Sequence, residues 1–332
     1  MINNFWNLLK GMAMGMAEVV PGVSGGTIAL ITGIYEKLIY TIKSVDKDFI
    51  IHLFSGQWKK IQTDLDLGFL FSLMLGMLMG IVIGVFGISY LFENYPEPLW
   101  GFFFGLILAS CIYVGKKVKK WEFSHIGILL IGLIIAYGIT VISPAEGNTS
   151  SWYVFTAGMI AICALILPGI SGSFILLLMG MYTVIIPTLK NFLSSPNLSE
   201  FWIIVVFGSG CLVGLLGFSR IMNYLFNRFP DKTLVLLVGF MLGSLNKIWP
   251  WRNVSEILSK ESYSNVFVTD LKDLESYIDG GYKVLKESNV LPGAYWMSSP
   301  KVYLTIGAFI LGFLVLFFFD LMANRFQKKT IV

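Results

Sequence analysis

Long apolar stretches separated by short polar loops dominate the hydropathy pattern of this chain. A helix needs about 20 apolar residues to cross the hydrocarbon core of a membrane, and several stretches approach that length. The expected spans are 69–92, 99–114, 126–142, 201–219, 234–249 and 302–322. The pattern therefore predicts an all-α, polytopic membrane protein.

Two further apolar regions are built differently, because each consists of two short halves interrupted by Pro and Gly. The halves are 5–20 and 27–42 in the first region, and 152–167 and 174–189 in the second. A break in the backbone at membrane depth is tolerated only where it is buried in protein or lines a watery cavity. We therefore expect two re-entrant helical hairpins, over 5–42 and 152–189.

An internal repeat relates the two hairpins. The sequence PGVSGG at 21–26, with GIY at 33–35, matches PGISGS at 168–173, with GMY at 180–182, at one constant offset. Further along, YLFENYP at 90–96 matches YLFNRFP at 224–230 at a second, smaller offset. Two motifs in the same order predict a duplicated chain.

The duplication divides the chain into two membrane repeats. The expected units are 1–142 with spans over about 69–142, 143–323 with spans over about 201–249 and 302–322, an extracytoplasmic insertion at 251–300 and a cytoplasmic tail at 324–332. In the insertion, helical apolar spacing occurs around Leu271, Leu274 and Ile278.

Composition supports the membrane assignment, because 13% of the residues are charged and the mean hydropathy is +0.75. Soluble domains carry roughly 25% charged residues, so a water-soluble fold is excluded. The net charge of +4 lies mostly in short loops and indicates orientation, with no nucleic-acid partner expected.

Basic residues gather on one side of the membrane if each hairpin returns to the side it entered from. They are Lys43, Lys47, Lys59, Lys60, Lys116, Lys117, Lys119, Lys120, Arg220, Arg228, Arg325, Lys328 and Lys329. That side is expected to be cytoplasmic and to hold both termini. Three spans then separate corresponding points of the halves, so the second half is inverted relative to the first, as in many secondary transporters.

The hairpin turns carry residues suited to anion binding. Ser24 and Ser171 are expected N-caps, and the glycines beside them leave backbone N–H groups open to a ligand. Two such tips would cradle a phosphate or carboxylate with the hydroxyls of Ser24, Thr27, Ser171 and Ser173. The candidate binding residues are Pro21, Gly22, Ser24, Gly25, Gly26, Thr27, Pro168, Gly169, Ser171, Gly172, Ser173 and Arg220. The alternative is that these small residues only permit tight turns and close helix packing.

Two charged residues lie within apolar sequence. Glu18 precedes the first turn near the end of its half-helix, where burial and the helix dipole disfavour a negative charge, so it is a candidate proton-coupling group. Its repeat counterpart is Leu165. The alternative is a solvated acid at the mouth of the hairpin. Arg220 fits phosphate recognition through its fork of donors, or snorkelling to the cytoplasmic interface.

The remaining reactive side chains predict no enzyme, metal site or cofactor. Cys111, Cys163 and Cys211 lie in apolar stretches without metal-ligand spacing and are expected to pack. His52 and His125 lie in or beside polar loops and are expected to be solvated. No acid pair or nucleophile accompanies them.

The passage EVVPGVSGGTIA at 18–29 with GIY at 33–35, and its echo LPGISGS at 167–173, closely resemble the bacterial polyprenyl-phosphate (undecaprenyl-phosphate) translocase family, formerly a membrane domain of unknown function. The resemblance extends to about residue 249 and the final span, and leaves the 251–300 insertion unmatched. It implies a flippase that returns the undecaprenyl phosphate carrier lipid across the bacterial cytoplasmic membrane for recycling in cell-envelope synthesis. A transporter or channel for a small inorganic anion is the alternative, since facing helix tips also coordinate ions in pores.

Overall fold

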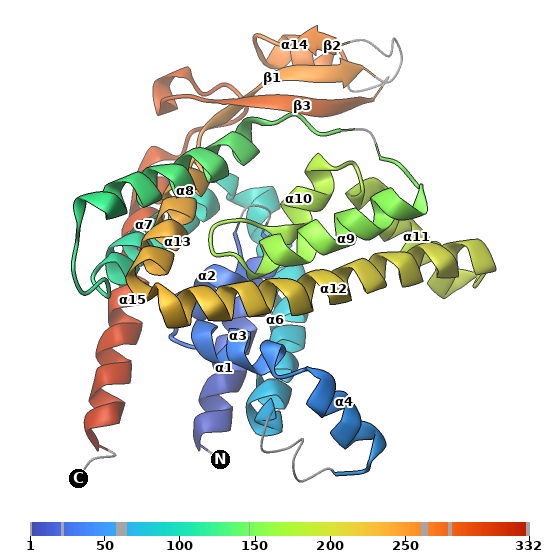
Figure 1. The fold of residues 1–332 in the computed structure, drawn as a ribbon. Coiled ribbons are helices and arrows are strands. Elements are labelled where there is room, and N and C mark those ends of the chain that lie inside the picture. Colours follow the sequence, from blue (N-terminus) through green and yellow to red (C-terminus); the bar gives the residue numbers. More distant parts are fainter. Residues whose placement is uncertain are drawn as a thin grey trace.

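Helices form almost all of the apolar part of the chain, with a small sheet at one end (Figure 1). The computed structural model describes residues 2–20, 23–57, 65–145, 147–259, 265–277 and 281–329. The helices are α1 (Ile2–Glu18), α2 (Gly25–Ile31), α3 (Tyr35–Lys43), α4 (Lys47–Phe54), α6 (Leu67–Asn94), α7 (Pro96–Gly115), α8 (Phe123–Val141), α9 (Ser151–Ile166), α10 (Gly172–Leu178), α11 (Tyr182–Ser194), α12 (Leu198–Arg228), α13 (Pro230–Ser244), α14 (Leu271–Glu275) and α15 (Val302–Lys329).

Among the described residues, four helices are long and apolar enough to cross a membrane, namely α6, α7, α8 and α12. By length and composition, they match four of the six expected spans. The expected span 234–249 is shorter than predicted, because α13 has 15 residues and gives way to a turn before Pro250. The last expected span lies within α15.

Close packing of glycine against backbone holds a helix pair together in each half. A Cβ atom added to Gly76 of α6 would overlap the carbonyl oxygen of Leu8 in α1, and one added to Gly210 of α12 would overlap that of Phe155 in α9. Gly76 and Gly210 are related by the offset of the YLFENYP and YLFNRFP motifs, and Leu8 and Phe155 by that of the PGxSG motifs. The same contact is therefore built twice.

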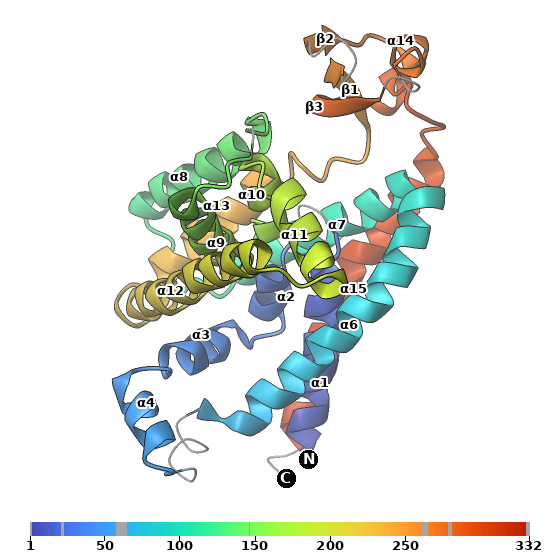
Figure 2. The same cartoon turned by 90° about the vertical axis from the view of Figure 1, so that its right-hand side faces the viewer.

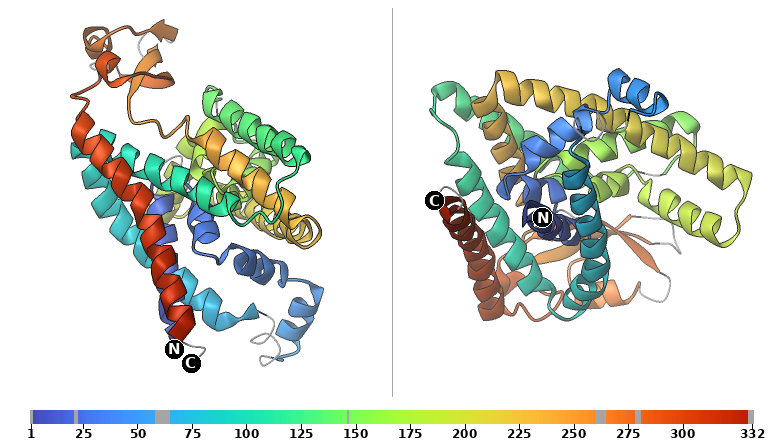
Figure 3. Two further views of the ribbon diagram at one scale, coloured as in Figure 1. Left: turned by 90° about the vertical axis from the view of Figure 1, so that its left-hand side faces the viewer. Right: turned by 90° about the horizontal axis from the view of Figure 1, so that it is seen from below.

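The third long helix of each half packs on the other half. Helix α8 lies against α13 and α15 lies against α7, and Figure 3 shows the second pair side by side in both views. Glycine again permits the contact, because a Cβ atom at Gly105 of α7 would overlap the carbonyl oxygen of Phe309, and one at Gly239 of α13 that of Leu129. The two halves are therefore interlocked.

The second limb of each expected hairpin differs from the prediction. Regions 27–42 and 174–189 are each two short helices with a turn between them, α2–α3 and α10–α11, and the second pair bends by 106°. Gly33 (φ +74°) and Gly180 (φ +67°) adopt the left-handed conformation that ends the first helix of each pair. The N–H of Ile34 bonds to the carbonyl of Ala29 at 3.0 Å, which completes a Schellman cap.

The two chain ends lie together at one end of the molecule, and the insertion lies at the opposite end (Figures 1 and 2). The insertion contains strands β1 (Arg252–Ser259), β2 (Asn265–Phe267) and β3 (Tyr282–Asn289), paired antiparallel in the order β2-β1-β3, and a 3-10 turn, η1 (Pro292–Ala294). Its own apolar core contains Val254, Ile257, Val268 and Leu274.

This sheet corrects the prediction of an entirely helical chain. The expected helical spacing around Leu271 and Leu274 is confirmed by α14, whereas Ile278 lies outside the described residues. The strands escaped the sequence pattern because β1 carries a bulge, which breaks the two-residue alternation of a half-buried strand.

A buried carboxylate anchors the insertion to the helices. Glu97, in the first turn of α7, is fully buried. It accepts hydrogen bonds from Tyr295 (3.0 Å) and Ser298 and forms an ion pair with Lys301 (Oε2–Nζ 3.3 Å). The segment that returns from the sheet to α15 is therefore fixed to the start of α7.

Replacing Gly76 or Gly210 by Ala should destabilise the protein. The added methyl group would push α1 and α6 apart in the first case, and α9 and α12 apart in the second. Overpacking of this kind costs about 2 kcal/mol, or about 5 °C in the unfolding temperature. Thermal unfolding of the purified protein in detergent, followed by tryptophan fluorescence, measures the change. The controls are Gly87→Ala in α6 and Gly208→Ala in α12, where an added Cβ meets no atom within 4 Å. Equal unfolding temperatures for test and control variants would contradict this packing.

Candidate functional site

The two hairpin tips bind each other through reciprocal hydrogen bonds. The Ser24 hydroxyl caps α2 by accepting from Gly26 N (3.0 Å), and it lies 3.2 Å from the carbonyl oxygens of Leu165 and Leu167 at the end of α9. In return, Gly169 N–H donates to the Thr27 hydroxyl at 3.0 Å. Ser24 and Thr27 are fully buried. Each tip therefore satisfies polar groups of the other.

Glycine makes this approach possible. A Cβ atom on Gly26 would overlap the carbonyl oxygen of Ile166, so no larger residue fits against the end of α9. Gly169 has φ +86°, and a Cβ atom there would lie 2.8 Å from Met241 Cα in α13. Pro168, directly before it, is buried and cannot continue α9. Pro21 and Gly22 lie outside the described residues.

The side chain of Glu18, the last residue of α1, contacts the start of α2. Its Oε1 accepts a hydrogen bond of 2.6 Å from the N–H of Gly25, at the start of α2. A Cβ atom on Gly25 would lie 2.7 Å from the same oxygen. The carboxylate therefore occupies one of the backbone donors that the sequence left open to a ligand.

The second tip has a different arrangement. The Ser171 hydroxyl caps α10 by accepting from Phe174 N (3.4 Å) and lies 2.9 Å from the Ser173 hydroxyl. Gly172 packs against α9, where a Cβ atom would lie 2.7 Å from the carbonyl oxygen of Ala161. Here the two hydroxyls bond to one another, and among the described residues neither bonds across to the first tip.

A small pocket lies at the second tip. Its wall contains Ala136, Ile139, Thr140, Gly169, Ile170, Ser171, Phe174, Ser244 and Lys247. Lys247 supplies the positive charge, with its Nζ 5.1 Å from the centre of the Phe174 ring. The free volume of the pocket is about 10 Å³, which is room for about one water molecule. Hydroxyls and an ammonium group are donors that bind a phosphate or carboxylate, and such an anion would enter only if the pocket widened.

Lys247 was not among the residues that the sequence singled out. The available signal was a lone cation near the end of an apolar stretch, three residues after Ser244 and so on the same helical face. Its connection to Ser171 arises only from packing of α13 on the second hairpin.

Arg220 lies elsewhere. Its guanidinium is exposed and donates to the carbonyl oxygens of Leu216 (2.7 Å) and Val45 (3.1 Å), which joins α12 to the loop after α3. The structure does not bring it into the hydrogen-bond network of the tips.

The other reactive side chains have structural surroundings. His125 is buried rather than solvated, because its Nδ1 accepts from the backbone N–H of Glu122 at the start of α8 (3.0 Å). Cys111 packs in the core, and no cluster of potential metal ligands occurs within the described ranges.

Comparison with known proteins identifies the family of this chain. The model of a family described as undecaprenyl phosphate translocase-like matches residues 14–266. A polyprenyl-phosphate transporter of Vibrio cholerae is 43% identical over 251 residues, which cover 76% of this chain and 79% of that protein. A polyprenyl-phosphate transporter of Staphylococcus aureus is 33% identical over 259 residues, which cover 74% of this chain and 86% of that protein. No solved structure matches the chain. The chain belongs to the undecaprenyl phosphate translocase-like family.

Proposed function

We propose that this protein is a multi-pass bacterial membrane protein that flips a polyprenyl phosphate, the undecaprenyl phosphate carrier lipid, across the cytoplasmic membrane for reuse in envelope synthesis. The family match and the names of two relatives support this function. The physical problem is also specific to such a lipid. Its isoprenoid tail can remain in the bilayer, whereas its charged headgroup faces a large desolvation cost unless protein groups replace water.

The proposed architecture is two inverted-topology repeats, each with a re-entrant hairpin and three spans, and with both termini cytoplasmic. The duplicated glycine contacts between α1 and α6 and between α9 and α12 support a repeat. The chain ends lie opposite the insertion, which supports an extracytoplasmic insertion (Figure 2). Inverted repeats with broken helices meeting at mid-depth are the plan of many secondary transporters.

The proposed headgroup site is the junction of the hairpin tips, and the pocket at the second tip carries this assignment. Ser171 and Ser244 supply hydroxyls there, Lys247 supplies a positive charge, and the surrounding wall is mostly apolar. In this site, Ser24 and Thr27 act by fixing the first tip to the second, and Ser171 acts on the headgroup itself. The energy of a charge-assisted hydrogen bond, about 1.5–3 kcal/mol, is large enough to select a phosphate.

Flipping of a labelled polyprenyl phosphate in proteoliposomes tests the function. We expect protein-dependent movement of the lipid between leaflets, with no uptake of inorganic phosphate or chloride by the same vesicles. Anion uptake without lipid movement would make the protein an inorganic anion transporter and would refute the proposal.

Replacing Ser171 by Ala should reduce the initial flipping rate about 10-fold, since losing a hydrogen bond to a charged headgroup costs at least about 1.4 kcal/mol. The matched control is Asn197→Ala, which removes a side-chain cap of similar strength at the start of α12 (Asn197 Oδ1 to Glu200 N, 2.9 Å) far from the pocket. We expect both variants to lose similar stability and only Ser171→Ala to lose transport. Equal flipping rates for the two variants would exclude Ser171 from the site.

Glu18 is proposed to couple lipid movement to a proton. Glu18→Gln retains an oxygen that can accept from Gly25 N–H, so the tip stays closed while titration is lost. We expect this variant to keep its unfolding temperature and to lose the pH dependence of flipping, whereas Glu18→Ala loses the tip contact and unfolds at a lower temperature. A wild-type pH profile in Glu18→Gln would rule out the coupling role.

A further inference from the structure

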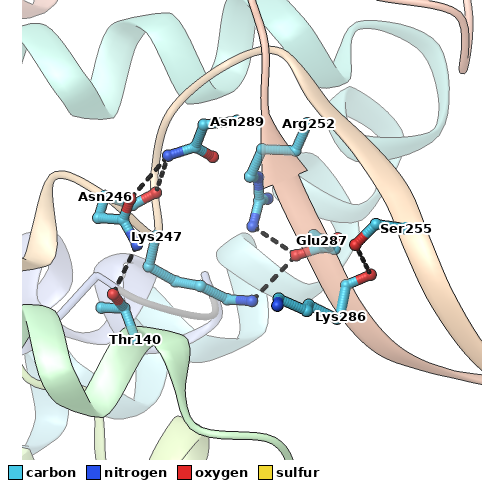
Figure 4. A network of polar contacts seen from close by, with 8 residues as sticks. All are labelled: Thr140, Asn246, Lys247, Arg252, Ser255, Lys286, Glu287 and Asn289. Atoms are coloured by element: carbon cyan, nitrogen blue, oxygen red, sulfur yellow. Dashed lines mark hydrogen bonds and ion pairs between the residues drawn. The ribbon is translucent and has the colours of Figure 1, made fainter.

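One carboxylate of the insertion pairs with two cations, and one of these, Lys247, lines the pocket. Oε2 of Glu287, in β3, lies 3.0 Å from Lys247 Nζ and 2.8 Å from Arg252 Nη1 (Figure 4). The three side chains are partly shielded from solvent, with exposed fractions of 30% for Glu287, 24% for Lys247 and 11% for Arg252. Ion pairs that are partly shielded in this way are screened less by salt than surface pairs.

Lys247 belongs to two environments at once. It lines the pocket with Ser171, and its Nζ pairs with a residue of the insertion. A long, flexible lysine side chain can change partner by rotating its terminal bonds, without movement of α13. Arg252 is fixed more firmly, because its guanidinium lies 4.7 Å from the centre of the Trp100 ring in α7.

The fold positions Glu287 for this contact. Asn289, two residues along β3, donates to Asn246 Oδ1 (2.8 Å) and to its carbonyl oxygen (3.0 Å), which ties the strand to the residue before Lys247 (Figure 4). The pairing of β1 with β3 is also irregular here, since the register shifts between Val254, opposite Glu287, and Glu256. Bulges of this kind redirect side chains and occur often beside functional sites.

The charges favour a phosphate over the carboxylate. Two cations share one negative charge, and burial of Glu287, which opposes ionisation, is outweighed by Arg252 and then Lys247, so that its pKa lies below the usual range. A phosphate monoester carries about −1.5 to −2 charges at pH 7 and offers three acceptor oxygens. If Lys247 moves to a phosphate, Glu287 keeps Arg252 and is not left as an unpaired charge.

We propose that Lys247 is an exchangeable headgroup ligand, which Glu287 of the insertion holds and which a phosphate monoester entering the pocket takes over. This inference rests on the proposed function for the source of the phosphate. Glu287 thereby acts as an internal competitor, and the insertion sets the affinity of the outward-facing site. The insertion thus has a defined role in substrate binding.

The test is the dissociation constant of polyprenyl phosphate for the full-length protein in detergent. Glu287→Gln should lower the dissociation constant about 5-fold, and Lys247→Gln should raise it about 10-fold. In a protein that already carries Lys247→Gln, adding Glu287→Gln should change the dissociation constant less than 2-fold, because the exchanging cation is gone. The matched control is Lys286→Gln, which removes a charge from the neighbouring exposed position of β3 and should change it less than 2-fold. Thermal unfolding of each variant verifies that the fold is intact.

An unchanged dissociation constant in Lys247→Gln, or an equal gain from Glu287→Gln in both backgrounds, would overturn the exchange. Polyprenol, which lacks the phosphate, should bind independently of both residues, and equal shifts for polyprenol would also overturn it. If the two substitutions shifted the dissociation constant of inorganic phosphate but not that of polyprenyl phosphate, Lys247 would bind a free anion instead of a lipid headgroup. Flipping by the wild-type protein is measured separately. If the lipid is flipped but the substitutions do not change the dissociation constant as expected, only the exchange is refuted. If the dissociation constants change as expected but the lipid is not flipped, only the proposed function is refuted.

Discussion

The reciprocal bonding of the two hairpin tips is the constraint on which the rest of the structure depends. A break between two apolar helices exposes backbone groups that an apolar environment cannot satisfy. Here the Ser24 hydroxyl lies against the carbonyls that end α9, and Gly169 N–H donates to Thr27. Each break is therefore completed by the opposite half, and neither hairpin can be built correctly without the other.

Several features follow from this joint. Gly26 and Gly169 must be glycine because backbone of another segment occupies the space of a side chain. The packing of α8 on α13 and of α15 on α7 also joins the two halves. Ser24, Thr27 and Gly25 of the first tip are engaged by these contacts and by Glu18, whereas Ser171 of the second tip lines a pocket. The described parts of the two tips therefore differ, although the motifs are repeated.

The sequence was sufficient for features that depend on local or repeated signals. Hydropathy identified α6, α7, α8 and α12, and the Ser-Gly pairs identified the N-caps Ser24 and Ser171, because capping needs only neighbouring residues. It missed the second breaks at Gly33 and Gly180, since a single glycine within an apolar stretch does not by itself end a helix.

Features that depend on contacts between residues far apart in the sequence could not be predicted from the sequence. Lys247 meets Ser171 only because α13 packs on the second hairpin, and it meets Glu287 only because the insertion folds back over α13. Arg220 was a candidate for phosphate recognition or for snorkelling to the interface, and its guanidinium donates to the loop after α3. Chemistry alone identified plausible groups, and tertiary packing decided which of them meet.

The most direct measurement is an experimental structure of the protein in lipid nanodiscs with polyprenyl phosphate bound. We expect headgroup density in the pocket at the second tip, within hydrogen-bond distance of Ser171 Oγ and Lys247 Nζ, with the isoprenoid tail leading into lipid. Headgroup density beside Arg220, or anywhere apart from the joined tips, would contradict this expectation.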